Sequence, residues 1–102
     1  MNIVFMGTPD FSVPMLEKLN SDNDINISYV VTKADTKANR GQKLNFSAVK
    51  QKAIELGLNI LQPEKIKNNV EVIRKIKESN PDFIVVVAYG QILSKEILDI
   101  PK

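Results

Sequence analysis

The sequence has 102 residues, enough for one domain, and 43% of them are hydrophobic, so the chain can build a core. The net charge is only +2, and neither cysteine nor histidine occurs. These features exclude a disulfide framework, thiolate metal sites and a chain that binds polyanions over its whole surface. The longest apolar stretch, FIVVVAY, is far shorter than the ~20 residues of a membrane span. We therefore expect a cytoplasmic protein without a bound metal.

The first predicted elements are a strand and a helix. Residues 2–6 (NIVFM) are apolar after Asn2 and rich in strand-forming side chains, and a helical stripe that includes Leu16 follows them. Pro14 is expected in the first turn of that helix, where a missing N–H costs least. Asp10 or Ser12 is the expected helix cap.

The second strand is predicted at residues 27–31 (ISYVV). The next sixteen residues, 32–47, show no periodicity, and this length is unusual for a loop between a strand and a helix. A second helix is expected from the apolar stripe of Val49, Ala53 and Leu56. Ser47 is its expected N-cap, and Gly57 ends it.

Two more strands and one helix complete the pattern. Residues 59–61 (NIL) predict a short strand, and residues 83–88 (FIVVVA) predict a strand that is apolar throughout. The helix between them carries Val72, Ile73 and Ile76, and Asn80–Pro81 ends it. We therefore predict an α/β fold, Rossmann-like and doubly wound, with a mostly parallel, incomplete sheet of about four strands.

Ligands of such sheets bind beyond the carboxyl ends of the strands, where three loops are candidates. The loop at residues 7–11 (GTPDF) has too few glycines for a dinucleotide site. Its residues also fit a plain turn from strand to helix that binds no ligand. The loop at 89–94 (YGQILS) fits either a simple turn or a backbone that faces a planar heterocycle. The residues alone leave these alternatives open.

The third loop is basic. Six basic residues and one acid, Asp35, lie between Lys33 and Lys52, which gives these twenty residues a net charge of +5. A solvated insertion would explain this charge. The functional interpretation is contact with phosphates, because the guanidinium of Arg40 forms bidentate bonds and lysines act as point charges.

Three motifs, GTPDF, LQPE and VVVAYGQIL, occur in an order and spacing that resemble the first third of the methionyl-tRNA formyltransferases. The resemblance covers all 102 residues. Its weakest part is the basic loop, where KADTKANRGQKL replaces the usual QPDRPAGRGKKL but keeps Arg40 and Gly41. The resemblance implies a formyl donor, 10-formyltetrahydrofolate, and an acceptor, initiator methionyl-tRNA.

The resemblance also implies roles for individual residues. The expected folate-binding residues are Ala88, Tyr89, Gly90, Gln91, Ile92 and Leu93. The expected tRNA-binding residues are Arg40, Gly41, Lys43 and Lys37. The expected residues of the aminoacyl side are Thr8, Asp10 and Phe11.

The family performs its chemistry with an Asn, a His and an Asp that the resemblance places beyond Lys102. We therefore expect residues 1–102 to be the N-terminal part of the formyltransferase domain, without catalytic residues, without the second half of that domain and without the C-terminal β-barrel. The alternatives are a non-catalytic half-domain that binds folate or RNA, and an inert remnant.

Overall fold

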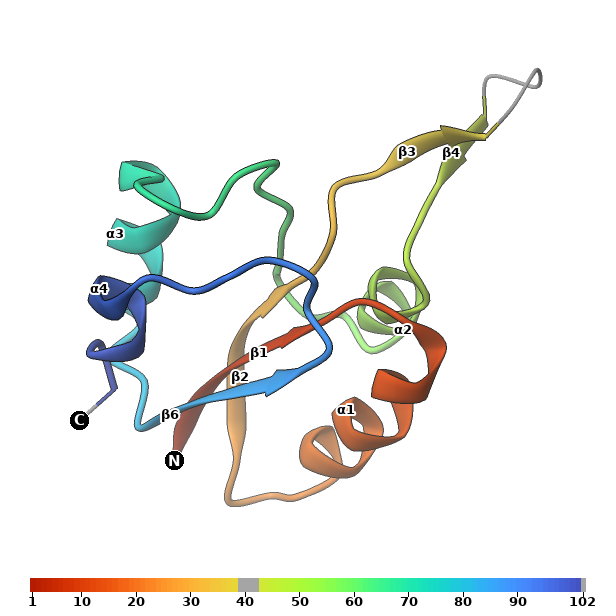
Figure 1. Ribbon diagram of the computed structural model, residues 1–102. Helices are drawn as coiled ribbons and strands as arrows, with labels where there is room; N and C mark the ends of the chain where they lie inside the picture. The colour runs from red at the N-terminus through yellow and green to blue at the C-terminus, as the bar shows by residue number, and fades with distance from the viewer. Residues whose placement is uncertain (39–42, 102) are drawn as a thin grey trace.

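The computed structural model describes residues 1–38 and 43–101 (Figure 1). Four strands form one parallel sheet in the spatial order β5-β2-β1-β6. They are β1 (Asn2–Gly7), β2 (Asn26–Val31), β5 (Ile60–Leu61) and β6 (Phe83–Val87). The four predicted strands and the predicted α/β fold class are thereby confirmed.

Helices alternate with these strands along the chain, and the last of them follows β6. They are the 3-10 helix η1 (Asp10–Ser12), α1 (Val13–Asn20), α2 (Ala48–Glu55), α3 (Val70–Glu78) and the short α4 (Lys95–Leu98), which the sequence analysis did not predict. The predicted cap of α2 is confirmed, because the Ser47 side chain accepts a hydrogen bond from the Lys50 N–H, and Gly57 follows with a φ of 70°. Ser12 occupies the N-cap position of α1, as one of the two predicted candidates, but neither its side chain nor that of Asp10 makes a cap bond among the described residues.

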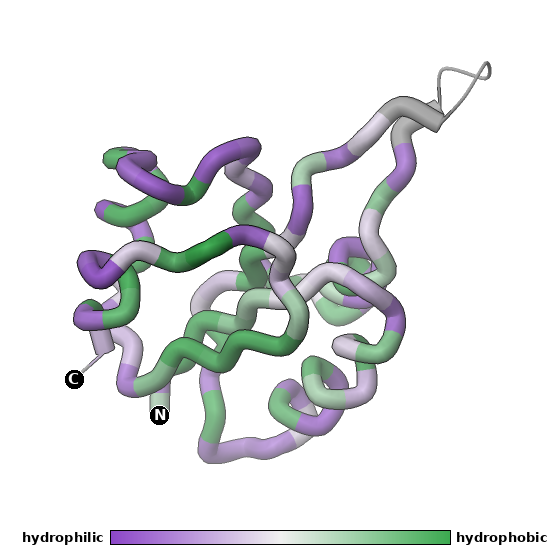
Figure 2. Tube along the Cα trace, in the orientation of Figure 1, coloured by the Kyte–Doolittle hydropathy of each residue, from purple (hydrophilic) through white to green (hydrophobic). Residues whose placement is uncertain are grey.

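Apolar side chains pack on both faces of the sheet, as the uninterrupted apolar strands predicted, and the strands of the sheet are largely hydrophobic along their length (Figure 2). Successive residues of β1 point to opposite faces, so Phe5 packs with Leu16 and Val49, while Met6 packs with Ile76 and Ile97. Helices α1 and α2 therefore cover one face, and α3 and α4 cover the other (Figure 1).

The segment at residues 32–47 is more regular than predicted. Strands β3 (Thr36–Ala38) and β4 (Lys43–Asn45) pair in antiparallel fashion and project from the body of the domain (Figure 1). The expectation of an irregular loop is wrong because two short strands satisfy their backbone groups mutually, without the hydrophobic pattern that marks strands in the core.

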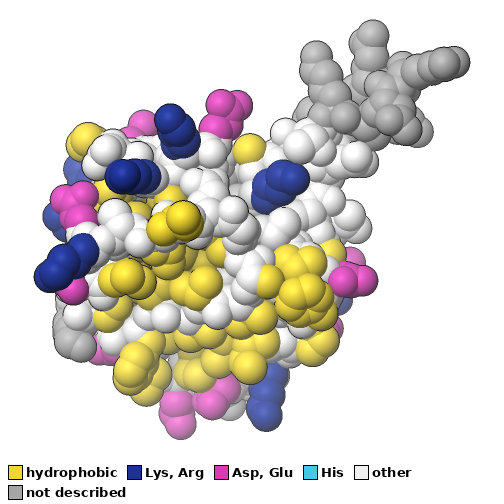
Figure 3. Space-filling model, viewed as in Figure 1, with side chains coloured by type: hydrophobic (Ala, Val, Ile, Leu, Met, Phe, Trp, Pro, Cys, Tyr) yellow, Lys and Arg dark blue, Asp and Glu magenta, His cyan; other side chains and the backbone are white. Residues whose placement is uncertain are grey.

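Strand β6 is more exposed than its sequence indicates. Within the described residues it pairs only with β1, and Phe83 and Val86 are 55% and 46% exposed. Figure 3 shows hydrophobic side chains gathered over this side of the molecule. An uninterrupted apolar run therefore does not show whether a strand lies inside the sheet, with a partner on each side, or at the edge of the sheet.

Candidate functional site

A cleft of about 620 Å³ lies at the carboxyl edge of the parallel sheet. Its walls are Thr8 and Pro9 after β1, residues 33–36 after β2, Glu64 beyond β5, and residues 88–91 after β6. All four strands of the sheet contribute because parallel strands end at the same edge. The cleft is therefore where the sequence analysis expected a ligand.

The cleft brings together only some of the predicted site residues. Thr8 and the first four residues of the 88–93 segment line it, whereas Ile92 is 91% exposed and Leu93 packs against the core. Asp10 borders a neighbouring hollow of about 380 Å³ that Thr8 also lines, and Phe11 is 67% exposed.

The loop after β6 has an unusual backbone. Ala88 has a φ of 55° and Gly90 a φ of 102°, so the chain turns sharply twice within three residues. The Thr8 hydroxyl donates a hydrogen bond of 2.8 Å to the Tyr89 carbonyl, which ties this loop to the one after β1. A Cβ added at Gly90 would have no atom within 4 Å, so the glycine meets a conformational need and leaves its surroundings open.

Gln91 fastens the same loop to the LQPE segment. Its side-chain oxygen accepts from the Ile66 N–H at 2.9 Å, and its amide donates to the carbonyls of Pro63 and Glu64, both at 3.2 Å. The sequence analysis noted LQPE only as a motif and missed this link. The Gln91 side chain is therefore engaged in hydrogen bonds within the protein.

Gly7 allows two strands to approach closely at the floor of the site. A Cβ there would lie 2.9 Å from the Val87 carbonyl oxygen and 3.1 Å from the Ser12 Cβ. The buried Ser12 hydroxyl donates to the same carbonyl at 2.6 Å. The glycine of GTPDF is thus explained by packing between β1, β6 and η1.

Tyr89 contributes to the cleft and to the core. Its side chain packs in the core cluster on the α3 and α4 side, and the residue is only 3% exposed. Burial raises the pKa of the phenol to about 12, and no acceptor or donor among the described residues engages the hydroxyl. Tyr89 is therefore neutral at physiological pH.

We expect Tyr89→Phe to leave the free energy of unfolding unchanged, or to raise it by about 1 kcal/mol, because it removes a buried hydroxyl without a partner. In the wild type, the folded-state pKa of about 12 lies above the ordinary value of 10. The contribution of the buried, neutral phenol to the free energy of unfolding is therefore fully present below pH 10 and is lost as the pH rises towards 12. Urea unfolding at pH 7 and pH 11 measures both effects, and a marked loss of stability at pH 7 would contradict this account.

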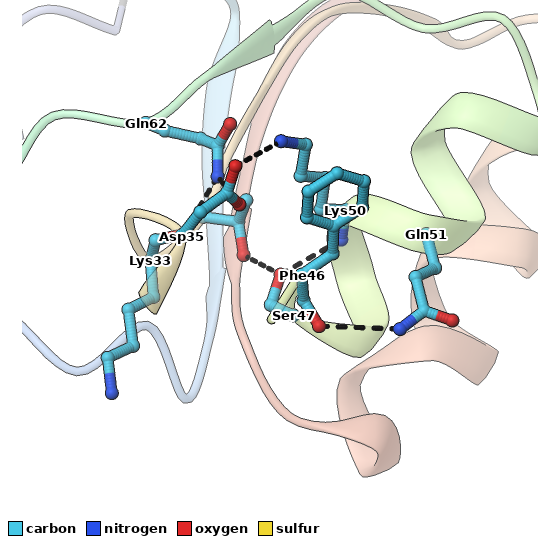
Figure 4. Close-up of polar contacts among 8 residues, drawn as sticks. Lys33, Asp35, Phe46, Ser47, Lys50, Gln51 and Gln62 are labelled. Carbon is cyan, nitrogen blue, oxygen red and sulfur yellow. Dashed lines mark hydrogen bonds and ion pairs between the residues drawn. The ribbon is translucent and has the colours of Figure 1, made fainter. Parts of the chain in front are cut away.

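Two cations of the basic segment form ion pairs within the protein. Lys50 contacts the Asp35 carboxylate at 2.6 Å (Figure 4), and Lys52 lies 2.8 Å from Glu55 and 3.3 Å from Glu17. The net charge of +5 already counts Asp35 but not Glu17 or Glu55, so the pairing of Lys52 lowers the charge available to a ligand below that value. Arg40 and Gly41 lie outside the described residues, and for Lys37 and Lys43 the structure describes the backbone of β3 and β4.

Asp35 joins the basic segment to two other side chains. Besides Lys50, it accepts a hydrogen bond of 2.7 Å from the Gln62 side chain (Figure 4). The Lys50 ammonium first, and the Gln62 amide second, hold the pKa of Asp35 below its ordinary value. The sequence analysis missed this cluster, because nothing in the spacing of positions 35, 50 and 62 indicates that they meet.

Two negative findings apply to residues 1–38 and 43–101. No helix in this part of the chain is long and apolar enough to cross a membrane. No group of three or more acidic side chains there is placed to hold a metal ion.

The family model for formyl transferases matches residues 1–102. Because this match extends over the whole chain, the chain belongs to the formyl transferase family. The parallel sheet and the cleft at its carboxyl edge agree with this assignment. Among solved structures, phosphoribosylglycinamide formyltransferase from Bacillus halodurans has a similar fold, with a TM-score of 0.70 at 11% identity. The similarity covers 98% of this chain and 51% of that one.

Curated relatives with much higher sequence identity carry the name methionyl-tRNA formyltransferase. The chain is 57% identical to the methionyl-tRNA formyltransferase of Clostridium acetobutylicum and 52% identical to that of Clostridium botulinum strain Alaska E43, over all 102 residues in both cases. A protein of the same name from Caldanaerobacter subterraneus is 49% identical. The chain spans about a third of the length of these curated relatives, 32% in the first two.

Proposed function

We propose that residues 1–102 form the N-terminal part of a cytoplasmic methionyl-tRNA formyltransferase. The complete enzyme transfers the formyl group of 10-formyltetrahydrofolate to the amino group of initiator methionyl-tRNA. The similarity to relatives of that name over the whole chain supports this proposal. The part of the molecule described here binds and orients the two substrates.

The folate is assigned to the loop after β6. The main support for this assignment is the backbone of the loop, because a φ of 102° at Gly90 turns the chain beside the cleft. No hydrogen bond among the described residues uses the N–H or C=O of Gly90. Adjacent donors and acceptors suit a pterin ring, whose edge carries both. Residues 88–91 line the cleft, and residues 92 and 93 extend the proposed folate segment beyond it.

The tRNA is assigned to the β3–β4 hairpin. The hairpin projects from the domain, so an acceptor stem can reach it without entering the cleft (Figure 1). We assign Lys37, Arg40, Gly41 and Lys43 to the phosphate backbone, because lysine and arginine provide the charge that phosphates require. Thr8, Asp10 and Phe11, on the adjoining loop after β1, are assigned to the aminoacyl end.

Gly90→Val tests the folate assignment. We expect binding of a folate analogue to be abolished, because a side chain at this position enters the proposed path of the ring and because valine disfavours a positive φ. Isothermal titration calorimetry of the 102-residue chain measures the affinity.

Gly57→Val is the matched control for this variant. Gly57 also has a positive φ, of 70°, and a Cβ there would likewise have no atom within 4 Å, but Gly57 lies after α2 and does not line the cleft. Both variants carry a backbone cost of about 1–2 kcal/mol, and only Gly90→Val should lose the ligand. Equal affinity in the two folded variants would overturn the folate assignment.

A further inference from the structure

The hairpin leaves the domain through two connections, and side chains fasten both. On the β2 side, the buried Thr32 lies with its hydroxyl 2.6 Å from that of Ser47. On the β4 side, Ser47 caps α2 by accepting from the Lys50 N–H at 3.0 Å, and Gln51 donates to the Phe46 carbonyl at 3.3 Å. The two connections are therefore linked to each other and to the start of α2.

Asp35, Lys50 and Gln62 add a charged connection closer to β3. The three residues come from the segment before β3, from the first turn of α2 and from the position directly after β5 (Figure 4). Asp35 uses one carboxylate oxygen for Lys50 and the other for Gln62, at 2.6 and 2.7 Å. Gln62 also donates to the Lys33 carbonyl at 3.1 Å, so it holds the same segment at two points.

The surroundings favour a single arrangement of these side chains. The side chains of Lys50 and Asp35 are only 13% and 18% exposed, so the pair is partly shielded from water. The Lys50 ammonium also lies 3.8 Å from the centre of the Phe46 ring, a cation–π contact with the residue that follows β4. The Lys50 ammonium therefore contacts both sides of the hairpin base, Asp35 before β3 and Phe46 after β4.

We propose that Asp35, Lys50 and Gln62 are positioning residues that set the direction in which the β3–β4 hairpin leaves the domain. The inference rests on the proposed function, in which that hairpin meets the acceptor stem of the tRNA. The cluster contacts no substrate in this scheme. It acts by holding strands β3 and β4 in a fixed direction relative to the cleft, two of whose wall residues, Lys33 and Asp35, belong to the fastened segment.

The direction of the hairpin can be measured without any substrate. The chain has no cysteine, so nitroxide labels at Ala38→Cys in β3 and Asn20→Cys in α1 react at these two positions alone. Pulsed electron paramagnetic resonance then gives the distribution of distances between hairpin and body. We expect Asp35→Asn and Lys50→Met to broaden this distribution while the far-ultraviolet circular dichroism stays that of the folded chain.

Two further variants separate positioning from a general effect on α2. Lys50→Arg keeps the ion pair with Asp35 and should restore the narrow distribution. Lys52→Met removes a cation of the same helix that pairs with Glu17 and Glu55, away from the hairpin base, and should leave the distribution unchanged. A distribution in Asp35→Asn and Lys50→Met as narrow as that of the wild type would overturn the proposal.

An RNA-binding measurement tests whether the cluster matters for the proposed function. The ligand is a labelled RNA stem-loop that carries the acceptor stem of initiator tRNA. We expect Asp35→Asn to weaken this binding about three- to tenfold, and Lys50→Arg to retain it. If Asp35→Asn and Lys50→Met broaden the distance distribution but Arg40→Ala leaves RNA affinity unchanged, the positioning role is supported and the tRNA contact of the proposed function is overturned. If the distribution in those two variants stays narrow while Arg40→Ala weakens RNA binding, the tRNA contact is supported and the positioning role is overturned.

Discussion

Gly7→Val is expected to lower the free energy of unfolding by about 1–3 kcal/mol, the range for an overpacked site. The added side chain would begin 2.9 Å from the Val87 carbonyl oxygen, a backbone atom that cannot move without disturbing the pairing of β1 with β6. The same carbonyl accepts the Ser12 hydroxyl, so a shift also weakens a buried hydrogen bond. Urea denaturation, followed by circular dichroism, measures the loss.

Two control variants identify the cause of this loss. Ser12→Ala removes the hydrogen bond without adding atoms and should cost about 1 kcal/mol, less than Gly7→Val. Gly57→Ala adds a Cβ in open space and reports only the backbone cost of a positive φ. If Gly7→Val unfolded at the same urea concentration as the wild type, the close approach of β1, β6 and η1 would not explain the glycine.

Arg40→Ala is expected to weaken binding of initiator tRNA roughly 10- to 150-fold, the equivalent of one charge-assisted contact worth about 1.5–3 kcal/mol. Losing one phosphate contact should also reduce the slope of log affinity against log salt by about one unit. Lys43→Ala should do less, because neighbouring lysines replace a flexible ammonium more easily than a guanidinium. Fluorescence anisotropy with labelled tRNA at several salt concentrations measures both quantities.

The control for this variant removes a charge elsewhere. Lys18 is exposed on α1, at the end of that helix farther from the carboxyl edge of the sheet, and Lys18→Ala should change tRNA affinity little. Folate affinity should be the same in all of these variants, because the folate is assigned to another loop. Equal losses for folate and tRNA in Arg40→Ala would indicate a role in the fold, and an unchanged tRNA affinity would make the basic segment a solvated insertion.

The regular elements were predictable because their signals are local. The strands at 2–6 and 83–88 are continuous apolar runs, and Ser47 and Gly57 mark the ends of α2 with residue types that suit those positions chemically. The same local reasoning placed Ser12 at the start of α1 but did not identify the partner of its hydroxyl. Its hydroxyl had two possible partners, the helix end and a strand carbonyl 75 positions away, and the distant carbonyl is the one it contacts.

The candidate site was predictable in its location and much less so in its contacts. The order of strands and helices places the loops after β1, β2 and β6 at one edge, so Thr8 and Gly90 were expected near each other. The hydrogen bonds of Gln91 with Pro63 and Glu64 join segments more than 25 positions apart, and a single sequence does not record such pairings.

By itself, the amino-acid sequence determined the alternation of strands and helices, the class of fold and, through three short motifs, the family. Each of these follows from composition and periodicity within a few residues, or from the order of the motifs. Only the tertiary structure decided that Gly7 serves strand packing, that Lys50 and Lys52 are paired with acids, and that Asp35 joins the hairpin to α2 and to the end of β5. The reason is physical: these roles depend on which atoms lie within about 3 Å of one another, and folding sets such distances between residues far apart in the chain.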